Sequence, residues 1–324
     1  MFLAGDIGGT KSRLAIFADG ADPRRPLVEE VLPSGRFSGM GALIREFLNR
    51  TNQSADRACF AIAGPVVDGR AATTNLPWVA EAEGIRREFG FRSVRLVNDL
   101  AATVRAVPLL EPGELHTLSP GATAADGVIA VIAPGTGLGE AFLTREGERW
   151  QEHATEGGHT DFGATGPLQE ELLRELRKEF DHVSYERVCA GPAIPRLYRF
   201  LRERSQEEEP AGFAAQLSAA ADPGQVIVEE ALARKSGVCA QAIRLFCAIL
   251  GAEAGNLALK TLSRGGVYIG GGIAPRLLPF LEEEAFAAAF RRKGRMADLL
   301  VRMPVRVILE PRAALIGAAS FFET

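Results

Sequence analysis

The stretch FLAGDIGGTKSRLAIF, residues 2–17, predicts two strands joined by a glycine-rich turn. It narrowly misses a Walker A loop, because threonine stands where the second glycine belongs and a strand, not a helix, follows. Successive amides in such a turn can bind an anion, so we interpret residues 5–10 as a phosphate-binding hairpin; the alternative is an ordinary glycine-rich β-turn. Asp6, beside the turn, can hold Mg²⁺ directly or through water.

A second segment of the same kind lies near the middle of the chain. The apolar run 127–133 is followed by PGTGLG, residues 134–139, and then by apolar residues 141–143. A Rossmann fingerprint requires a different glycine spacing and a following helix, so spacing and context both exclude it. Two such hairpins predict a pseudo-duplicated protein with one lobe built around each, and a nucleotide bound between them.

Between the hairpins, Asn98 and Asp99 stand where a short β-branched and apolar strand gives way to a helix. On these residues alone, Asp99 is most simply a helix cap, because Asn and Asp accept hydrogen bonds from the orphan amides of a first turn. A carboxylate at a strand end can also act as a base. The surrounding phosphate hairpins favour the second interpretation, and Asp99 can serve both roles through different oxygens.

Polar residues suited to sugar hydroxyls occur in three other places. The segment 153–161 contains two histidines and two acidic residues of metal-ligand type. The glycine pair between Glu156 and His159 favours a hydroxyl-binding loop; a structural metal site and a generic surface turn are the alternatives. Glu186 follows a predicted amphipathic helix, and alone it is a solvated or capping residue. Asn75 belongs to a small polar cluster that lines either a sugar pocket or a surface turn.

The C-terminal half contains two further features. Three glycines, 270–272, follow a predicted strand and permit close approach of a flat ligand such as adenine. An alanine-rich helical region from about Val226 to Leu262 is predicted to form two helices that meet near Gly251.

The bulk composition restricts the classes of partner. The chain has 324 residues, 47% of them hydrophobic, and a formal net charge of −4. It is long enough for two lobes with separate cores, and its charge argues against nucleic acid or an anionic membrane as a partner. The four cysteines form no CxxC pair, so we predict buried free thiols in a reducing cytosol. No run approaches 18 apolar residues and Asp6 interrupts any signal peptide, so we expect neither secretion nor a membrane span.

Six motifs stand in a specific order along the chain: Gly5-Asp6-Ile7-Gly8-Gly9-Thr10, Val97-Asn98-Asp99, Gly135-Thr136-Gly137-Leu138-Gly139, Glu156-Gly157-Gly158-His159, Ser184-Tyr185-Glu186-Arg187-Val188 and Gly271-Gly272-Ile273-Ala274-Pro275-Arg276. In this set the chain resembles the bacterial ATP-dependent glucokinase family. The resemblance implies an α/β, two-lobed actin/hexokinase-like (ribonuclease H-like) fold with a sugar and nucleotide cleft between the lobes. We expect a smaller lobe of residues 1–109 plus about 302–324, and a larger lobe of residues 110–301.

The resemblance also implies an activity and residue roles. The expected reaction is ATP-dependent phosphorylation of glucose at the 6-hydroxyl, with Mg²⁺, in the cytoplasm, commonly by a homodimer. Asp99 is the implied general base. The implied sugar ligands are Asn98, Glu156, His159 and Glu186, to which the polar cluster adds Asn75. The expected nucleotide-binding residues are Asp6, Gly8, Gly9, Thr10, Lys11, Gly135, Thr136, Gly137, Gly271 and Gly272, with Asp6 also near the metal.

Three positions depart from related patterns. Lys11 stands where the family usually has Asn, as in the related repressor/kinase (ROK) sugar kinases, and it either adds charge near the phosphates or points to solvent. Cys189 stands alone where ROK proteins carry a cysteine-rich zinc motif, so we expect no structural zinc. Glu140 occupies a usually apolar position, which is awkward beside phosphates unless it faces away. The alternatives are a kinase of mannose, fructose or an N-acetylhexosamine on the same fold, or a non-catalytic sugar sensor or actin-like ATPase.

Overall fold

The computed structural model describes residues 1–73, 76–209, 211–234 and 237–322. By its contacts the chain divides into two compact units: unit 1 comprises Met1–Glu114, Ala141–Ala154 and Glu310–Thr324, and unit 2 comprises Leu115–Glu140 and Thr155–Leu309. The contact pattern assigns the segment 141–154 to unit 1. The lobe boundaries expected from the sequence stay a prediction.

Unit 1 is built on a five-stranded sheet in the order β3-β2-β1-β4-β8. The first three strands form an antiparallel meander, and β4 and β8 run parallel to β1. β1 is apolar almost throughout, which is typical of a strand covered on both faces. The strand bounds are β1 (Phe2–Ile7), β2 (Lys11–Phe17), β3 (Val28–Pro33), β4 (Arg57–Ile62) and β8 (Ser93–Asn98).

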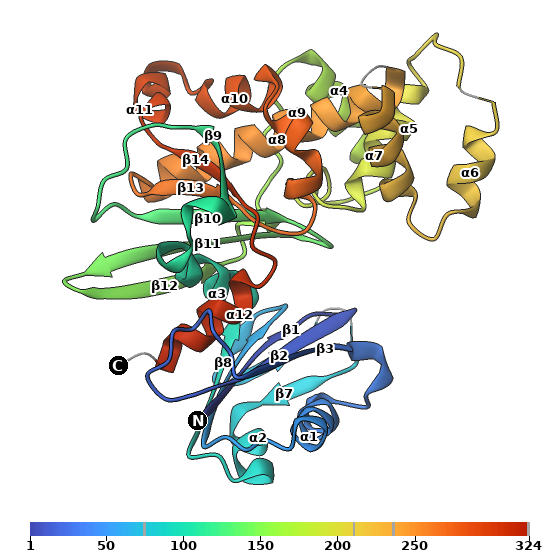
Figure 1. Ribbon diagram of the computed structural model, residues 1–324. Coiled ribbons are helices and arrows are strands. Elements are labelled where there is room, and N and C mark those ends of the chain that lie inside the picture. The colour runs from blue at the N-terminus through green and yellow to red at the C-terminus, as the bar shows by residue number, and fades with distance from the viewer. Residues whose placement is uncertain (74–75, 210, 235–236, 323–324) are drawn as a thin grey trace. The chain divides into compact units, whose positions relative to one another are not determined.

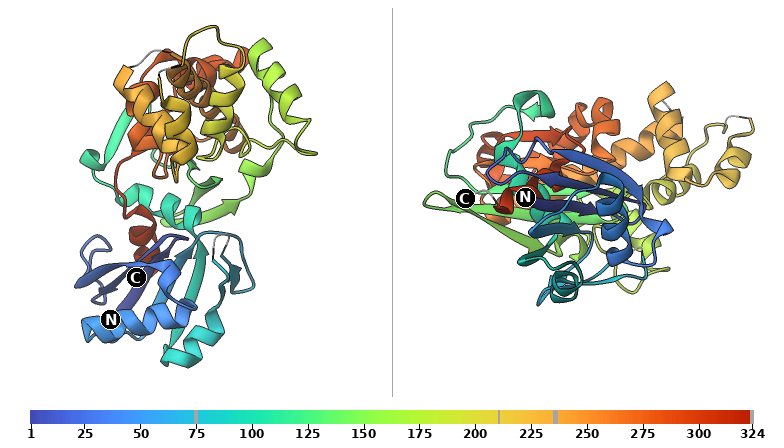
Figure 2. Two further views of the ribbon diagram at one scale, coloured as in Figure 1. Left: turned by 90° about the vertical axis from the view of Figure 1, so that its right-hand side faces the viewer. Right: turned by 60° about the horizontal axis from the view of Figure 1, so that its bottom comes forward.

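Alternate residues of β1 enter two separate cores. Leu3 and Ile7 belong to an apolar cluster with residues of α1 and α2, whereas Phe2 and Ala4 belong to a second cluster with residues of α3 and α12. Figures 1 and 2 show α1 and α2 on one face of the sheet and α12 on the other. The period of two along the strand therefore builds both layers. The helices are α1 (Met40–Thr51), α2 (Ala82–Phe89), α3 (Asp99–Ala106) and α12 (Ala313–Ala319).

The second large sheet has six strands in the order β12-β11-β10-β13-β14-β9. Apart from the added β9, this order repeats that of the first sheet, so the predicted pseudo-duplication is confirmed in the topology. β10, β13 and β14 are parallel, and β9 is antiparallel to β14. The bounds are β9 (Leu115–Ser119), β10 (Ile129–Pro134), β11 (Leu138–Glu146), β12 (Arg149–Thr155), β13 (Gly266–Ile269) and β14 (Val305–Ile308); a small third sheet contains β5 (Val66–Val67), β6 (Arg70–Ala72) and β7 (Val79–Glu81).

The central helix of unit 2, α8 (Gly237–Thr261), corrects one sequence expectation and bears on a second. Gly251 lies inside this helix and does not break it. A Cβ there would lie 2.3 Å from the carbonyl oxygen of Phe286 on α10 (Glu284–Arg291), so the position requires glycine. Gly251 thus permits two helices to pack closely and does not end a helix. α8 is also long and apolar enough to span a membrane by length and composition alone, although Gln241, Arg244 and Glu253 interrupt its apolar residues. Since 78% of its most apolar window is buried, α8 is a core helix here.

Seven other helices complete the described part of unit 2. α4 begins at Pro167, a residue suited to the first turn of a helix, and places Leu172 and Leu176 in the core. Their bounds are α4 (Pro167–Leu176), α5 (Ala193–Arg202), α6 (Phe213–Ala219), α7 (Pro223–Arg234), α9 (Leu278–Leu281), α10 (Glu284–Arg291) and α11 (Ala297–Val301). All four cysteines are buried and free, as predicted.

Candidate active site

The N-terminal hairpin differs in one respect from the sequence prediction. β1 continues past Asp6, so this residue lies in the strand and only residues 8–10 form the turn. The amide of Gly8 donates to the carbonyl of Lys11 at 3.2 Å, and a Cβ at Gly8 would lie 2.8 Å from that oxygen, so the turn requires glycine. Thr10 and Lys11 are exposed, which leaves the tip of the turn accessible to a ligand.

Two serines that the sequence reasoning missed hold this turn in place. Ser34 Oγ donates to the carbonyl of Gly8 at 2.7 Å, and it lies 2.9 Å from Ser12 Oγ. The amide of Ser34 donates to the carbonyl of Thr10 at 3.0 Å. Both hydroxyl side chains are fully buried, so their hydrogen bonds set the position of the turn. No local signal marks Ser34, because it comes from a separate segment after β3.

Asp6 lies where a free carboxylate is disfavoured. Burial raises the pKa of Asp6 to about 6, although the guanidinium of Arg13 on β2 opposes this shift. Arg13 is itself paired with Glu29. Mg²⁺ commonly binds one or two protein carboxylates together with phosphate oxygens and water, and a cation would favour ionised Asp6. In the described part of the chain, no group of three acidic, histidine or cysteine side chains gathers as a candidate metal cluster.

The corner between β8 and α3 uses its two polar residues differently from the sequence interpretation. The N-cap is Asn98, not Asp99: Asn98 Oδ1 accepts from the amides of Leu100 at 3.0 Å and Ala101 at 3.1 Å. Its Nδ2 donates to the carbonyl of Gly64 at 3.1 Å, so the second Nδ2 hydrogen is the group suited to a sugar hydroxyl. Asp99 begins α3, and its Oδ1 also accepts from the amide of Leu100, at 2.9 Å.

In unit 2 the second hairpin folds around a carboxylate. The amide of Gly135 donates to the carbonyl of Gly137 at 2.8 Å, which closes the turn, while the side chain of Thr136 is exposed. The amide of Leu138 donates to Glu186 Oε2 at 3.0 Å. A Cβ at Gly137 would lie 2.4 Å from that oxygen, so this glycine admits the carboxylate. The structure thus places Glu186, a predicted sugar ligand, against the predicted phosphate loop.

The loop after β12 brings a second predicted sugar ligand to Glu186. Residues 157–159 form a 3₁₀ turn, in which the amide of His159 donates to the carbonyl of Glu156 at 3.0 Å. The amide of Glu186 donates to the carbonyl of Gly158 at 2.8 Å, and His159 Nε2 lies 3.9 Å from Glu186 Oε2. Glu156 and His159 are exposed. His159 and Glu186 therefore share one accessible patch, and Glu156 starts the same turn.

Two candidate metal ligands of the segment 153–161 make contacts with other protein side chains. The ring of His153 stacks on Phe142 with centroids 4.6 Å apart, and its Nε2 lies 2.8 Å from Thr144 Oγ1. Asp161 Oδ1 lies 2.9 Å from His182 Nε2 at the surface. His153 and Asp161, two of the four candidate metal ligands, are therefore engaged by protein side chains.

Of the polar cluster near Asn75, the structure describes Thr73 and residues 76–78. Asn75 itself lies outside the described residues. Thr73 Oγ1 donates to the carbonyl of Leu76 at 2.8 Å. Trp78 is 4% exposed and packs in the core of unit 1, so its indole is a core side chain and does not line a sugar pocket.

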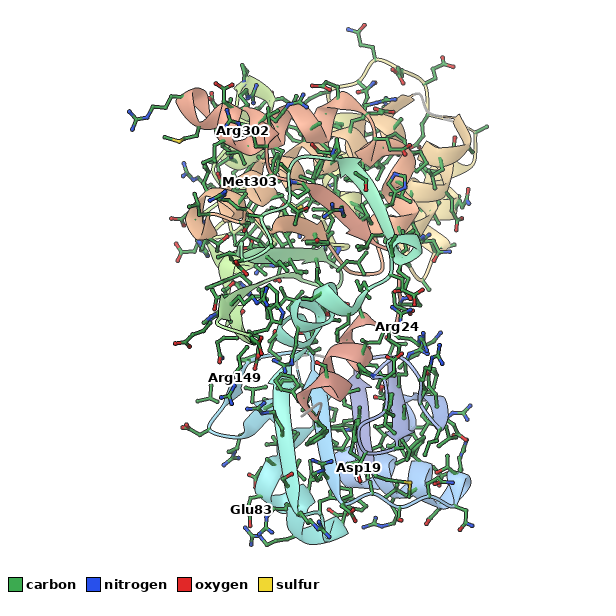
Figure 3. The ribbon with its side chains drawn as sticks, turned by 60° about the vertical axis from the view of Figure 1, so that its left-hand side comes forward. Asp19, Arg24, Glu83, Arg149, Arg302 and Met303 are labelled. Atoms are coloured by element: carbon green, nitrogen blue, oxygen red, sulfur yellow. The ribbon has the colours of Figure 1, made fainter. Side chains whose placement is uncertain are left out.

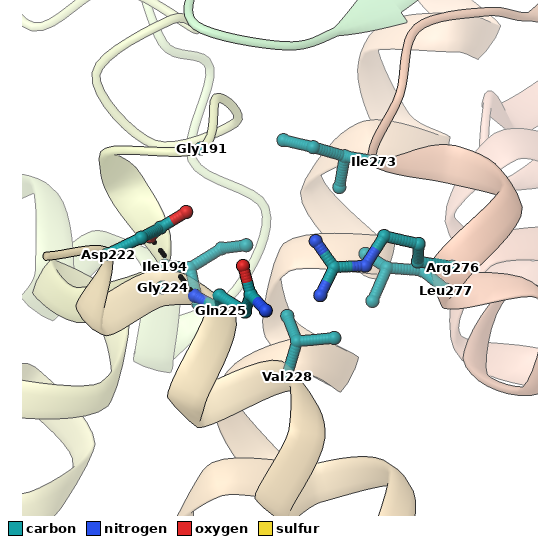
Figure 4. Close-up of a pocket in the computed structure, with 9 residues that line it drawn as sticks. All are labelled: Gly191, Ile194, Asp222, Gly224, Gln225, Val228, Ile273, Arg276 and Leu277. Carbon is teal, nitrogen blue, oxygen red and sulfur yellow. Dashed lines mark hydrogen bonds between the residues drawn. The ribbon is translucent and has the colours of Figure 1, made fainter. Parts of the chain in front are cut away.

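A pocket that is open to solvent lies in unit 2 beside the triple glycine, and its empty space, with the solvent at its mouth included, is about 320 Å³. Gly271 has φ of 80°, and a Cβ there would lie 2.5 Å from the carbonyl oxygen of Pro134, so this position requires glycine. The amide of Gly191, in the pocket wall, donates to the carbonyl of Gly135 at 2.8 Å and so links the pocket to the phosphate loop. Figure 4 shows Gln225 and Arg276 pointing toward one another across it. The wall is formed by Gly191, Ile194, Asp222, Gly224, Gln225, Val228, Ile273, Arg276 and Leu277.

Solved structures define the class to which this fold and site belong. A glucokinase crystal structure from an Antarctic psychrotroph matches with a TM-score of 0.82 at 34% identity, covering 99% of this chain and 98% of that one. A ROK family glucokinase from Streptomyces griseus, in complex with glucose and AMPPNP, shares the fold with a TM-score of 0.66 at 21% identity, covering 99% and 98%. With its two glycine hairpins, the chain has the actin/hexokinase-like fold of the sugar kinases.

Sequence comparison narrows the class further. The family model described as Glucokinase matches residues 3–324. The glucokinase of Trichormus variabilis is 39% identical over 334 residues, with 98% of each chain covered. That of Caulobacter sp. is 39% identical over 320 residues, covering 98% of this chain and 93% of the relative. The chain belongs to the glucokinase family, which confirms the resemblance predicted from its motifs.

Proposed function

We propose that this protein transfers the γ-phosphoryl group of ATP to the 6-hydroxyl of glucose. The observation that carries this proposal lies within unit 2. Glu186 accepts a hydrogen bond from Leu138 at the end of the second glycine hairpin, and it lies 3.9 Å from His159. Side chains suited to sugar hydroxyls thus adjoin a loop suited to phosphate, which is the combination that a sugar kinase needs.

We assign the general base to Asp99. Phosphoryl transfer depends mainly on positioning and charge neutralisation, so a base at the attacking hydroxyl has only to accept its proton as the new O–P bond forms. Asp99 begins α3, and Asn98 takes over the two amide hydrogen bonds of the N-cap. The carboxylate is therefore oriented by the corner without being the cap on which the helix depends.

Sugar selectivity is assigned to Asn98, Glu156, His159 and Glu186. Carboxylates accept hydrogen bonds from hydroxyls, and the histidine and the second Nδ2 hydrogen of the asparagine can donate them. An epimer that leaves one of these groups unpaired is bound less tightly, because an unsatisfied polar group is costly once water is excluded.

Nucleotide binding is assigned to the two glycine hairpins and to the pocket lined by Arg276. The exposed tip at Thr10 and Lys11 and the turn at Thr136 offer amides and one ammonium to phosphates. Asp6 would hold Mg²⁺ together with the phosphate oxygens, and this ion would neutralise charge on the transferred group. Gly271 and Gly272 are assigned to an adenosine moiety bound in the adjoining pocket, whose wall includes Gly191, Gly224 and the apolar side chains of Ile273 and Leu277.

We further propose a cytoplasmic homodimer. Four buried free thiols suit a reducing compartment, and the family resemblance supports a dimer. Sedimentation of the purified protein tests the oligomeric state.

The decisive experiment is a coupled assay of ADP release with a panel of hexoses. We expect ATP-dependent turnover with glucose to exceed that with mannose, fructose and N-acetylglucosamine. Preference for another hexose would move the assignment to a different kinase of the same fold. If no sugar stimulates ADP release, the kinase proposal fails.

A further inference from the structure

Two acidic side chains are buried together in unit 2, outside the set assigned to sugar and nucleotide. Glu140 on β11 is 2% exposed, and Glu253 on α8 is fully buried. Their carboxyl groups interact through a side-chain hydrogen bond. Two ionised carboxylates in contact repel one another, and a hydrogen bond between two carboxyl groups requires that one of them carry a proton.

The surroundings decide which carboxyl keeps the proton. Glu253 accepts from Asn256 Nδ2 at 2.8 Å and from Lys260 Nζ at 3.4 Å, and Tyr185 also hydrogen-bonds to it. Glu140 Oε1, by contrast, has no hydrogen-bond partner among the described residues. Burial, and then the charge of Glu253, raise the pKa of Glu140 to about 8, while Lys260 opposes the shift. Glu140 is therefore the protonated member at neutral pH.

Glu140 lies directly beneath the turn that starts at Glu156. A Cβ at Gly157 would lie 2.0 Å from Glu140 Oε2, so the carboxyl occupies the space beside this glycine. Thr155 Oγ1 donates to the carbonyl of Glu140 at 3.0 Å and accepts from the amide of Gly157 at 3.1 Å. Both the side chain and the backbone of Glu140 thus support the start of the turn.

Glu253 is linked through Tyr185 to the segment that carries Glu186. The amide of Tyr185 donates to the carbonyl of Thr160 at 3.0 Å, and the residue directly precedes Glu186. Asn256 Nδ2 donates to the Tyr185 hydroxyl at 3.0 Å as well as to Glu253. The carboxyl pair therefore lies at the junction of the two segments that carry His159 and Glu186.

We propose that Glu140 and Glu253, sharing one proton, are positioning residues for the glucose site: their hydrogen bond holds the turn 156–159 and the segment before Glu186 in the arrangement that binds the sugar. This inference rests on the proposed function. Loss of the shared proton places two carboxylates against each other under the turn, and the turn shifts to separate them. The other ionisable groups facing the pair are Lys260, Tyr185 and Cys189; Lys293 acts on it through Asn256.

The test measures the glucose dissociation constant by calorimetry, without ATP, between pH 7 and 9. If only the protonated pair binds glucose, the apparent dissociation constant rises about tenfold by pH 9, one unit above the pKa. Glu140→Gln keeps a neutral hydrogen-bond donor, so we expect wild-type affinity at pH 7 and no rise to pH 9. Glu140→Leu removes the hydrogen bond, so we expect weaker glucose binding already at pH 7. Glu146→Gln, at the exposed end of the same strand, should follow the wild type.

Activity measurements separate positioning from chemistry. In Glu140→Leu we expect KM for glucose to rise several-fold while kcat changes little, since no group that touches the reacting atoms is removed. A pH-independent affinity of the wild type, or a Glu140→Gln variant with the wild-type pH dependence, overturns the inference alone. Absence of glucose binding by the wild type at every pH overturns the proposed function as well.

Discussion

Replacing Asp6 by asparagine is expected to stabilise the free protein and to abolish its activity. The pKa of Asp6 is raised from 3.8 to about 6, chiefly by burial. The folded state therefore binds the proton more tightly than the unfolded state, and ionised Asp6 costs stability. This cost is absent below about pH 4, grows as the pH rises to 6, and is constant above. A shift of about two units at 1.36 kcal/mol each amounts to about 3 kcal/mol at pH 8.

Urea denaturation at pH 5 and pH 8 measures this effect. Both tryptophans, Trp78 and Trp150, belong to unit 1, so their fluorescence reports the unit that contains Asp6. We expect Asp6→Asn to raise the free energy of unfolding by up to about 3 kcal/mol at pH 8, and by less at pH 5. ATP with Mg²⁺ should raise the free energy of unfolding of the wild type but not that of the variant. The kcat of the variant should fall by orders of magnitude.

Asp19→Asn is the matched control. The N-terminal ammonium and then Arg57 hydrogen-bond to Asp19 and lower its pKa, so its removal should not stabilise the protein. Asp19, which is labelled in Figure 3, has 57% of its side chain exposed. An Asp6→Asn variant that is no more stable than the wild type at pH 8, or whose gain is the same at pH 5, would refute the reasoning.

Three further variants test the general base, the nucleotide pocket and the packing of α12 against α3. Asp99→Asn should lower kcat by roughly 10²- to 10⁴-fold with little change in the glucose dissociation constant, and wild-type turnover would sink the base assignment. Arg276→Ala should raise KM for ATP about tenfold without changing KM for glucose; equal changes in both would remove Arg276 from the nucleotide pocket. Gly317→Ala should destabilise unit 1 by about 1–3 kcal/mol in urea, because its Cβ would lie 1.8 Å from the Ala102 carbonyl oxygen; unchanged stability would show that the helices separate freely.

The sequence predicted those features that depend on local patterns. Glycine placed between two apolar runs is a strong signal for a strand-turn-strand hairpin, and both hairpins were found where they were expected. The same logic failed at Gly251, where a glycine in a helical region suggested a break. A local pattern does not distinguish a glycine needed for backbone freedom from one needed because another helix approaches within contact distance.

Side-chain roles were harder to predict than elements. Asn98 and Asp99 are both good capping residues, and only their backbone positions decide that Asn98 accepts the amide hydrogen bonds. No sequence pattern predicts the role of Ser34, because its hydrogen bond to the carbonyl of Gly8 joins segments that are distant in sequence. Glu140 is an unusual residue for its position in the sequence, but spacing along the chain does not identify its partner on α8.

The sequence by itself determined the hairpins, the duplicated α/β organisation and the family, because these follow from local backbone preferences, hydrophobic period and motif order. Only the tertiary structure decided which polar groups meet. It placed Glu186 against the second glycine hairpin, His159 beside Glu186, and Glu140 beneath Gly157. Hydrogen bonds and desolvation act over a few ångströms of space, whereas the residues concerned are separated along the chain by many positions, so no sequence pattern encodes their distances.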